Sequence, residues 1–122
     1  MASADGAGVI DWDEAMEQCG GDEEFLEELL VDLKEEVGGQ IEKMENALSE
    51  KGDGYQLKVQ RASHVIKGAS SNLFCEALRD TSTTLEQDAA KGKSDEILVE
   101  GFNQLKVAVT AYYAYLEANG WS

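Results

Sequence analysis

The chain has 122 residues, which is enough for one hydrophobic core but not for two. Its 25 acidic and 10 basic residues give a formal net charge of −15. This charge argues against a nucleic acid or an anionic membrane as partner, because basic surfaces bind both. No apolar run approaches the roughly 20 residues that span a bilayer, and Cys19 and Cys75 are too few for a disulfide framework. We expect one reduced domain without a signal peptide, located in the cytoplasm; the sequence leaves entry into the nucleus open.

Helical signals recur along the chain, and strand-like alternation is nowhere sustained. Residues 1–8 are small and rich in Gly and Ala, so we expect them to be unordered, with the domain covering residues 9–122. Asp11, with Glu14 three residues later, predicts the start of a short helix that ends at Gly20-Gly21.

A long helix is predicted from Asp22 to about Lys51. Gly38-Gly39 lies in its middle and should weaken or bend it. The outer face is strongly acidic, but the D-x-D-x-D-G spacing of a calcium loop is absent, so we expect a solvated face and no metal site. The apolar residues at helical spacing are Phe25, Leu26, Leu29, Leu30, Leu33, Val37, Ile41, Met44 and Leu48.

Three further helices complete the predicted fold. Gly52-Asp53-Gly54 is a turn that opens a helix running to about Leu73, and the next helix spans roughly residues 76–90. Ser94 caps the last helix, which stops at Asn119-Gly120. Four amphipathic helices joined by short turns, with a short leading one, predict an all-α protein: an antiparallel four-helix bundle with an additional N-terminal helix.

The helix before Leu73 carries His64, the only histidine of the chain. Because positions three and four apart share a helix face, His64 lies on a polar face opposite an apolar one. Residues 54–75 contain three basic and no acidic residues, although the chain as a whole is acidic. The polar face consists of Gln60, Arg61, His64, Lys67, Gly68 and Ser71, and the apolar face of Val59, Ala62, Ile66, Ala69 and Leu73.

The chemistry open to this histidine is limited by what the chain lacks. No Gly-x-Ser-x-Gly elbow or phosphate-binding Gly-rich loop is present, and one histidine cannot form a multi-histidine metal centre. An imidazole in water has a pKa of about 6.5, so its neutral nitrogen can accept a phosphoryl group at neutral pH. Phosphoryl transfer needs mainly positioning and charge neutralisation, for which Lys67 supplies a cation and Gly68 leaves space.

The run from His64 to Leu73, H-V-I-K-G-A-S-S-N-L, resembles the signature H-x-L-K-G-[SA]-S-x-x-[LIV]-G of histidine-containing phosphotransfer (HPt) proteins. Leu78 and then Leu85-Glu86 follow at the spacing that these proteins show in their next helix. The leading helix, the Gly-Gly-Asp break and the long acidic helix also match. The resemblance therefore covers the whole bundle, and the length is similar to that of stand-alone, single-domain members.

The resemblance implies a role for each matching residue. His64 would be the phosphoacceptor through Nε2, Lys67 would stabilise the phosphohistidine, and Gly68 would keep the site open. Glu86 falls where family members place a polar side chain near the imidazole, and there it would hold Nδ1–H and leave Nε2 as the nucleophile. A solvent-facing helix carboxylate is the alternative for Glu86. The candidates for partner docking are Gln60, Arg61, Ser71 and Phe74.

The implied partners are response-regulator receiver domains and a hybrid histidine kinase. The chain would take a phosphoryl group from the phosphoaspartate of one receiver and pass it to another, as a carrier and not as an enzyme. The receiver would supply the divalent metal and most of the catalytic machinery, so we expect no cofactor or metal of the chain's own. We also expect a monomer whose basic patch docks transiently against an acidic pocket.

The chain departs from the family pattern at the end of the histidine helix. Phe74 stands where the family usually has Gly, and Cys75 where Ala is frequent. The phenyl ring either turns inward to cap the core or adds an apolar contact to the docking surface. Ile66 in place of Leu and Ala69 in place of Ser are mild changes.

A second hypothesis of another class remains open. The chain could be an acidic helical adaptor that binds signalling partners without phosphotransfer, with His64 as a bystander. The intact His-x-x-Lys-Gly element and the acid-free patch around it favour the phosphorelay, and a hydrolase or metalloenzyme fits the sequence least.

Overall fold

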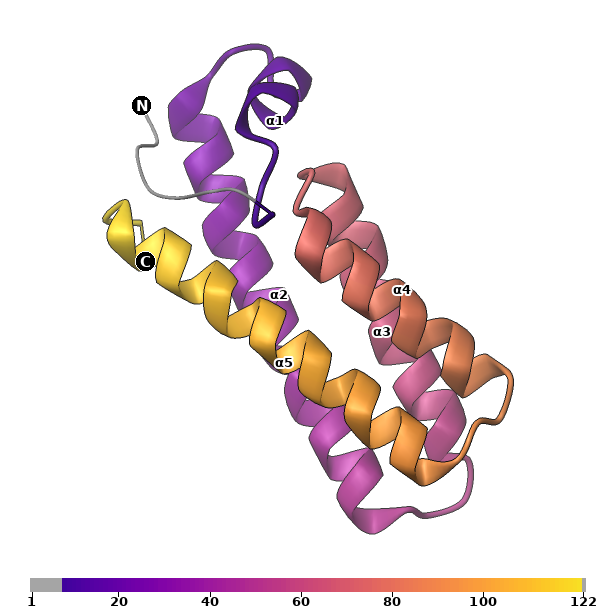
Figure 1. Cartoon of the computed structure of the whole chain (residues 1–122). Helices are drawn as coiled ribbons and strands as arrows, with labels where there is room; N and C mark the ends of the chain where they lie inside the picture. Colours follow the sequence, from indigo (N-terminus) through magenta and orange to yellow (C-terminus); the bar gives the residue numbers. More distant parts are fainter. Residues whose placement is uncertain (1–7, 122) are drawn as a thin grey trace.

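The structure, a computed structural model, describes residues 8–121, and the regular elements of this range are five α-helices (Figure 1). The all-α fold and the predicted order of helices are confirmed. Of the segment predicted to be unordered, only Gly8 lies within the described residues. The helices are α1 (Trp12–Gln18), α2 (Glu23–Glu50), α3 (Tyr55–Asn72), α4 (Glu76–Ala90) and α5 (Asp95–Ala118).

Local sequence signals explain where these helices begin. The side chains of Asp11, Asp22 and Ser94 each accept a hydrogen bond from the backbone N–H three residues later, as predicted for N-caps. Helix α3 instead follows Gly54, whose φ of 73° places it in the left-handed region that glycine adopts without strain. Helix α4 follows Cys75, whose side chain makes no capping bond.

Helices α2 to α5 form a closed bundle in which each packs against its neighbours in the chain and α2 also packs against α5. Figure 1 shows α3 and α4 as a hairpin on one side, while α2 and α5 run the length of the molecule. The core is mostly aliphatic, as the helical spacing predicts. None of the helices in residues 8–121 is long and apolar enough to cross a membrane.

Two features of α2 differ from the sequence expectation. The helix runs without a break through Gly38-Gly39, and Gly38 lies against α5, where an added Cβ would come within 3.3 Å of the Tyr113 hydroxyl. Phe25, predicted to lie in the apolar stripe, is 47% exposed. Adjacent helix positions are about 100° apart, and Leu26 takes the inward position at this level, so Phe25 turns to the surface.

The two ends of the described chain close against each other and against the α3–α4 turn. Trp12 of α1 stacks on Trp121 with ring centroids 5.4 Å apart, and Tyr115 meets the edge of Trp121 at 5.9 Å. The backbone N–H of Asp11 donates to the carbonyl of Phe74 at 2.9 Å. The short leading helix is thus attached to the end of the histidine-bearing helix.

The α3–α4 turn explains why glycine suits the position of Phe74. The N–H of Phe74 donates to the Ser71 carbonyl and the N–H of Cys75 to the Ser70 carbonyl, the two bonds of a Schellman motif. The residue in the middle of this motif needs a left-handed backbone, and Phe74 has a φ of 57°. Its ring is half-buried and packs against the core, which compensates for the strained backbone.

We predict that Phe74→Gly will be more stable than Phe74→Ala by about 1 kcal/mol, because both variants lose the ring but only glycine relieves the left-handed strain. The free energy of unfolding of Phe74→Ala should be about 1 to 2 kcal/mol lower than that of the wild type, because the variant buries less apolar surface. Urea unfolding of the three proteins measures both differences. Equal stability of the Gly and Ala variants would show that the backbone at this turn is not strained.

Candidate functional site

His64 lies near the middle of α3, with its side chain 65% exposed, on the face that the sequence predicts to be polar. The inward face of the same helix is anchored in the core by Ile66, which is fully buried. Two buried serines of α3 satisfy their hydroxyl groups within the helix: Ser63 donates to the Val59 carbonyl and Ser70 to the Ile66 carbonyl. The imidazole therefore projects from the solvent side of a helix whose opposite face is packed in the core.

Glu86 of α4 connects the two candidate residues of α3. Its Oε2 lies 2.7 Å from His64 Nδ1, and its Oε1 lies 2.7 Å from Lys67 Nζ. The Glu86 side chain is only 15% exposed, whereas that of Lys67 is 34% exposed. The close packing of α3 and α4 places the carboxylate between the imidazole and the ammonium group.

This geometry selects one tautomer of the neutral imidazole. An ionised carboxylate can only accept hydrogen bonds, so the proton of the ring must lie on Nδ1. Nε2 then keeps its lone pair. With the side chain largely exposed, that nitrogen is available to an electrophile from solution or from a docked protein.

The charge state of Glu86 follows from its contacts. Partial burial would raise the pKa of its carboxyl group, but the hydrogen bonds from Lys67 and from His64 outweigh burial and hold the pKa below its ordinary value. Glu86 is thus ionised at neutral pH and provides the acceptor that the Nδ1 proton requires.

The lowered pKa predicts how this cluster responds to acid. A carboxyl group whose pKa is lower in the folded state contributes stability above its unfolded pKa and loses that contribution as the pH falls through the folded value. We expect the stability advantage of the wild type over Glu86→Gln to be complete above pH 5 and to shrink as the pH falls below the ordinary value of 4.5. Chemical unfolding of both proteins between pH 7 and pH 3 measures this; an advantage that stays constant over the range would contradict it.

The remaining predicted residues surround this cluster without joining it. An added Cβ at Gly68 would meet nothing within 4 Å, so the space beside His64 is open. Arg61 is exposed and Gln60 half-buried on the same helix, and the Ser71 hydroxyl donates to the Lys67 carbonyl at 2.6 Å. Phe74 lies beyond the helix end, in the α3–α4 turn.

No group of three or more His, Cys, Asp or Glu side chains within residues 8–121 is arranged to hold a metal ion. Cys19 and Cys75 are both free thiols. Cys75 is fully buried, and burial raises the pKa of its thiol to about 12, so it remains a neutral packing residue at neutral pH.

The sequence interpretation did not anticipate that Lys67 pairs with Glu86. It assigned the cation to the incoming phosphoryl group and Glu86 to the imidazole, whereas one carboxylate contacts both. No single-sequence signal shows this, because residues 67 and 86 lie on different helices and only the packing of α3 on α4 brings them together.

Comparison with known proteins identifies the class to which this site belongs. A family model, described as the Hpt domain, matches residues 28–118, and the chain therefore belongs to the Hpt domain family, which serves in phosphorelay histidine phosphotransfer. This confirms the resemblance seen in the sequence.

A solved structure shows the same fold. It is the HPt domain from the Hpt sensor hybrid histidine kinase from Shewanella, with 19% sequence identity and a TM-score of 0.68, covering 91% of this chain and 96% of that one. None of the curated proteins matches the chain.

Proposed function

We propose that the protein is a phosphorelay intermediate that accepts a phosphoryl group on Nε2 of His64 from the phosphoaspartate of one receiver domain and transfers it to the aspartate of another. The observation that carries the proposal is the contact of the exposed imidazole with Glu86 through Nδ1. It leaves Nε2 as the free nucleophile on the solvent side. Belonging to the Hpt family supports the same chemistry.

The transfer step follows from the geometry of the site. The Nε2 lone pair forms a bond to phosphorus while the bond from phosphorus to the aspartate oxygen breaks, and the electron pair leaves with the receiver's carboxylate. The proton on Nδ1 stays hydrogen-bonded to Glu86, so no base has to remove it from the ring. In the second step, the aspartate of another receiver attacks the phosphorus, the bond from phosphorus to Nε2 breaks, and the electron pair returns to Nε2.

In this scheme the ammonium group of Lys67 has two successive partners, first Glu86 and then the phosphoryl group. Before transfer it binds Glu86, 2.7 Å away. Once a phosphoryl group is on Nε2, the partly exposed ammonium group can turn toward the new anionic oxygens, into the space that Gly68 leaves open. The ion pair with Glu86 thus holds the ammonium group of Lys67 close to the imidazole before transfer.

The receiver supplies the rest of the machinery in this proposal. The chain would be a monomeric carrier without a metal or cofactor of its own, and the divalent ion would come with the receiver. The hybrid histidine kinase at the start of the relay and the receivers on either side of this chain are its proposed partners. The exposed cation of Arg61, on the same helix face as His64, suits an acidic receiver surface.

The test is phosphoryl transfer from a phosphorylated receiver to the purified protein. The wild type should acquire an acid-labile, base-stable phosphoryl group, and His64→Gln should acquire none. If several receivers fail to label the wild type but still bind it, the adaptor hypothesis replaces the relay.

We predict that Lys67→Ala will slow transfer or shorten the lifetime of the phosphohistidine by about tenfold, because a charge-assisted hydrogen bond to the phosphoryl group contributes roughly 1.5 kcal/mol or more. The bundle should remain folded, since Lys67 is one-third exposed. Transfer rates and thermal unfolding measured on the same samples separate the two effects. A large loss of stability at an unchanged transfer rate would make Lys67 a structural residue.

A further inference from the structure

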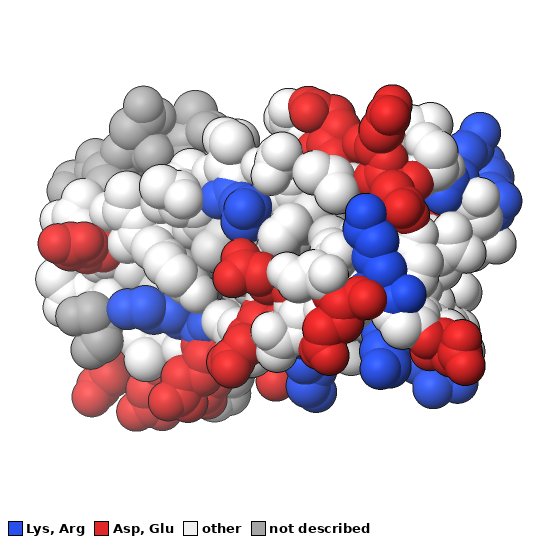
Figure 2. All heavy atoms as spheres, turned by 90° about the horizontal axis from the view of Figure 1, so that it is seen from below, with Lys and Arg blue, Asp and Glu red and all other residues white. Residues whose placement is uncertain are grey.

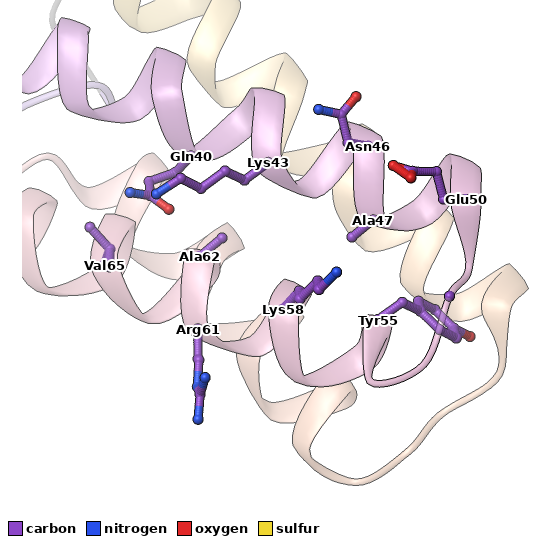
Figure 3. Close-up of a pocket in the computed structure, with 11 residues that line it drawn as sticks. Gln40, Lys43, Asn46, Ala47, Glu50, Tyr55, Lys58, Arg61, Ala62 and Val65 are labelled. Atoms are coloured by element: carbon purple, nitrogen blue, oxygen red, sulfur yellow. The ribbon is translucent and has the colours of Figure 1, made fainter.

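A second concave site lies beside the phosphoacceptor face, between the second half of α2 and the first half of α3 (Figure 3). This α2–α3 pocket has a volume of about 480 Å³, within the range of small-molecule binding sites. One wall is apolar, with Ala47, Ala62 and Val65, and Tyr55 closes the lower end. The Tyr55 hydroxyl is bonded to the Asp95 carboxylate, so this end is fixed.

Three cations line the pocket, and none of them forms an ion pair with another residue of the described chain. They are Lys43, Lys58 and Arg61, and Glu50 is the only carboxylate in the lining. Among the other cations, Lys51, Lys67 and Arg79 form ion pairs with Asp95, Glu86 and Asp80. In a chain with 25 acidic residues, three unpaired cations in one pocket form a local positive site.

The basic side chains of the molecule are unevenly distributed. Figure 2 shows acidic side chains spread across one face of the molecule, with most of the visible basic ones in the half away from the grey atoms. In the close-up, the Lys58 side chain points from α3 toward α2, the Lys43 side chain lies near Gln40, and Arg61 extends outward at the rim.

Gln40 adds an uncharged hydrogen-bonding group to the pocket lining. It is a buried polar residue, 8% exposed, and its amide makes no hydrogen bond with any of residues 8–121. The other buried polar residues are serines, and each donates to a carbonyl of its own helix. No fully enclosed side-chain N or O atom in this range lacks a partner, so the Gln40 amide must open into the pocket that it lines. The amide is therefore available to donate and accept hydrogen bonds with water or with a molecule bound in the pocket.

We propose that the α2–α3 pocket binds a small organic anion, a phosphate or carboxylate on an apolar body. The anionic group would lie between the ammonium groups of Lys43 and Lys58 and accept a hydrogen bond from the Gln40 amide. The apolar body would lie along Ala62 and Val65. This site is distinct from the cluster around His64, and the proposal does not depend on phosphotransfer.

The consequence for the phosphoacceptor face follows from the shared helix. Arg61 stands at the rim of the pocket and one turn before His64. An anion bound in the pocket would reduce the positive charge beside the imidazole, and so weaken the attraction of an acidic partner.

The experiment titrates the ¹⁵N-labelled full chain with phenyl phosphate, benzoate, inorganic phosphate and phenol, following the side-chain NH₂ signals of Gln40. Phenyl phosphate and benzoate should shift these signals in a saturable way, the stronger of the two showing which anionic group the pocket prefers. Inorganic phosphate should bind at least about fivefold more weakly because it lacks the apolar body, and phenol should have no effect.

Four variants locate the binding. Lys58→Ala and Gln40→Leu should each weaken the affinity for the better organic anion about tenfold, the loss expected for one charge-assisted or buried hydrogen bond. Lys91→Ala removes an exposed cation from the α4–α5 loop and should leave the affinity unchanged. His64→Gln should also leave it unchanged, which separates this pocket from the phosphoacceptor. Far-UV circular dichroism establishes that each variant is folded.

Three results would overturn the proposal. The first is that the Gln40 side-chain signals do not move with either organic anion. The second is that Lys58→Ala and Lys91→Ala weaken binding equally, and the third is that inorganic phosphate binds as well as phenyl phosphate. Either of the last two would reduce the effect to general charge attraction.

Discussion

Replacing Glu86 with leucine is expected to slow phosphoryl transfer to His64 by tenfold or more, the scale on which partners that orient a functional histidine act. The variant removes the acceptor of the Nδ1 proton and the anchor of Lys67 in one step, because one carboxylate contacts both at 2.7 Å. Without that acceptor the ring is free to place its proton on Nε2, where it blocks the attack. The rate of transfer from a phosphorylated receiver is the measurement.

A matched control and a second readout separate this role from a structural one. Gln87→Leu adds the same side chain at the next, exposed position of α4 and should transfer at the wild-type rate. Glu86→Gln keeps an acceptor oxygen for only one of the two partners and should fall between the wild type and the leucine variant. The ¹⁵N shifts of the His64 ring should report proton on Nδ1 in the wild type and a mixture of tautomers in Glu86→Leu. Faster transfer in Glu86→Leu would mean that the carboxylate withholds Lys67 from the reaction, contrary to the scheme proposed here.

The sequence predicted the helices well because their signals are local. Asp11, Asp22 and Ser94 cap the helices they were predicted to cap, since an N-cap depends only on the residues that follow it. The polar face of α3 was also predictable from local sequence, because helical periodicity determines which residues lie on the same side of a helix. His64 is accordingly exposed, and Ile66 is buried.

The parts that could not be predicted depend on contacts between helices. The sequence left Glu86 undecided between an orienting role and a solvent-facing one, and its contacts to His64 and Lys67 exist only because α4 packs against α3. The α2–α3 pocket also depends on contacts between helices, and in the sequence Gln40 is only one polar residue within a long helix. Only the packed bundle buries most of this residue and opens its amide into the pocket.

The backbone at Phe74 was predictable only in part. The departure from the usual glycine was visible in the sequence, but the positive φ was not. The Schellman bonds from Phe74 and Cys75 to the last turn of α3 require the left-handed backbone. The glycine that the resemblance led us to expect at this place would adopt such a backbone without strain, whereas the phenylalanine of this chain compensates for the strain by packing its ring on the core.

Replacing Tyr112 with alanine is expected to destabilise the bundle by about 3 to 5 kcal/mol, the largest stability effect that we predict for a single substitution. Tyr112 of α5 has no exposed surface and is the largest of the fully buried side chains. Its hydroxyl donates to the Leu30 carbonyl of α2, and burial raises the pKa of the phenol, so the group stays protonated and remains a donor. The alanine variant leaves a cavity at the α2–α5 contact and also an acceptor without this partner. Denaturant unfolding measures the loss.

Tyr112→Phe separates the hydrogen bond from the packing. It keeps the ring and should lose only about 1 to 2 kcal/mol, the cost of leaving the Leu30 carbonyl without the phenol. Its transfer rate should equal that of the wild type, because the site consists of α3 and α4 side chains, whereas Tyr112 joins α5 to α2. A stability loss in Tyr112→Phe as large as in Tyr112→Ala would place the main contribution in the hydrogen bond. A slowed transfer in a fully folded Tyr112→Phe would mean that the α2–α5 pair positions His64, which the contacts of the site do not predict.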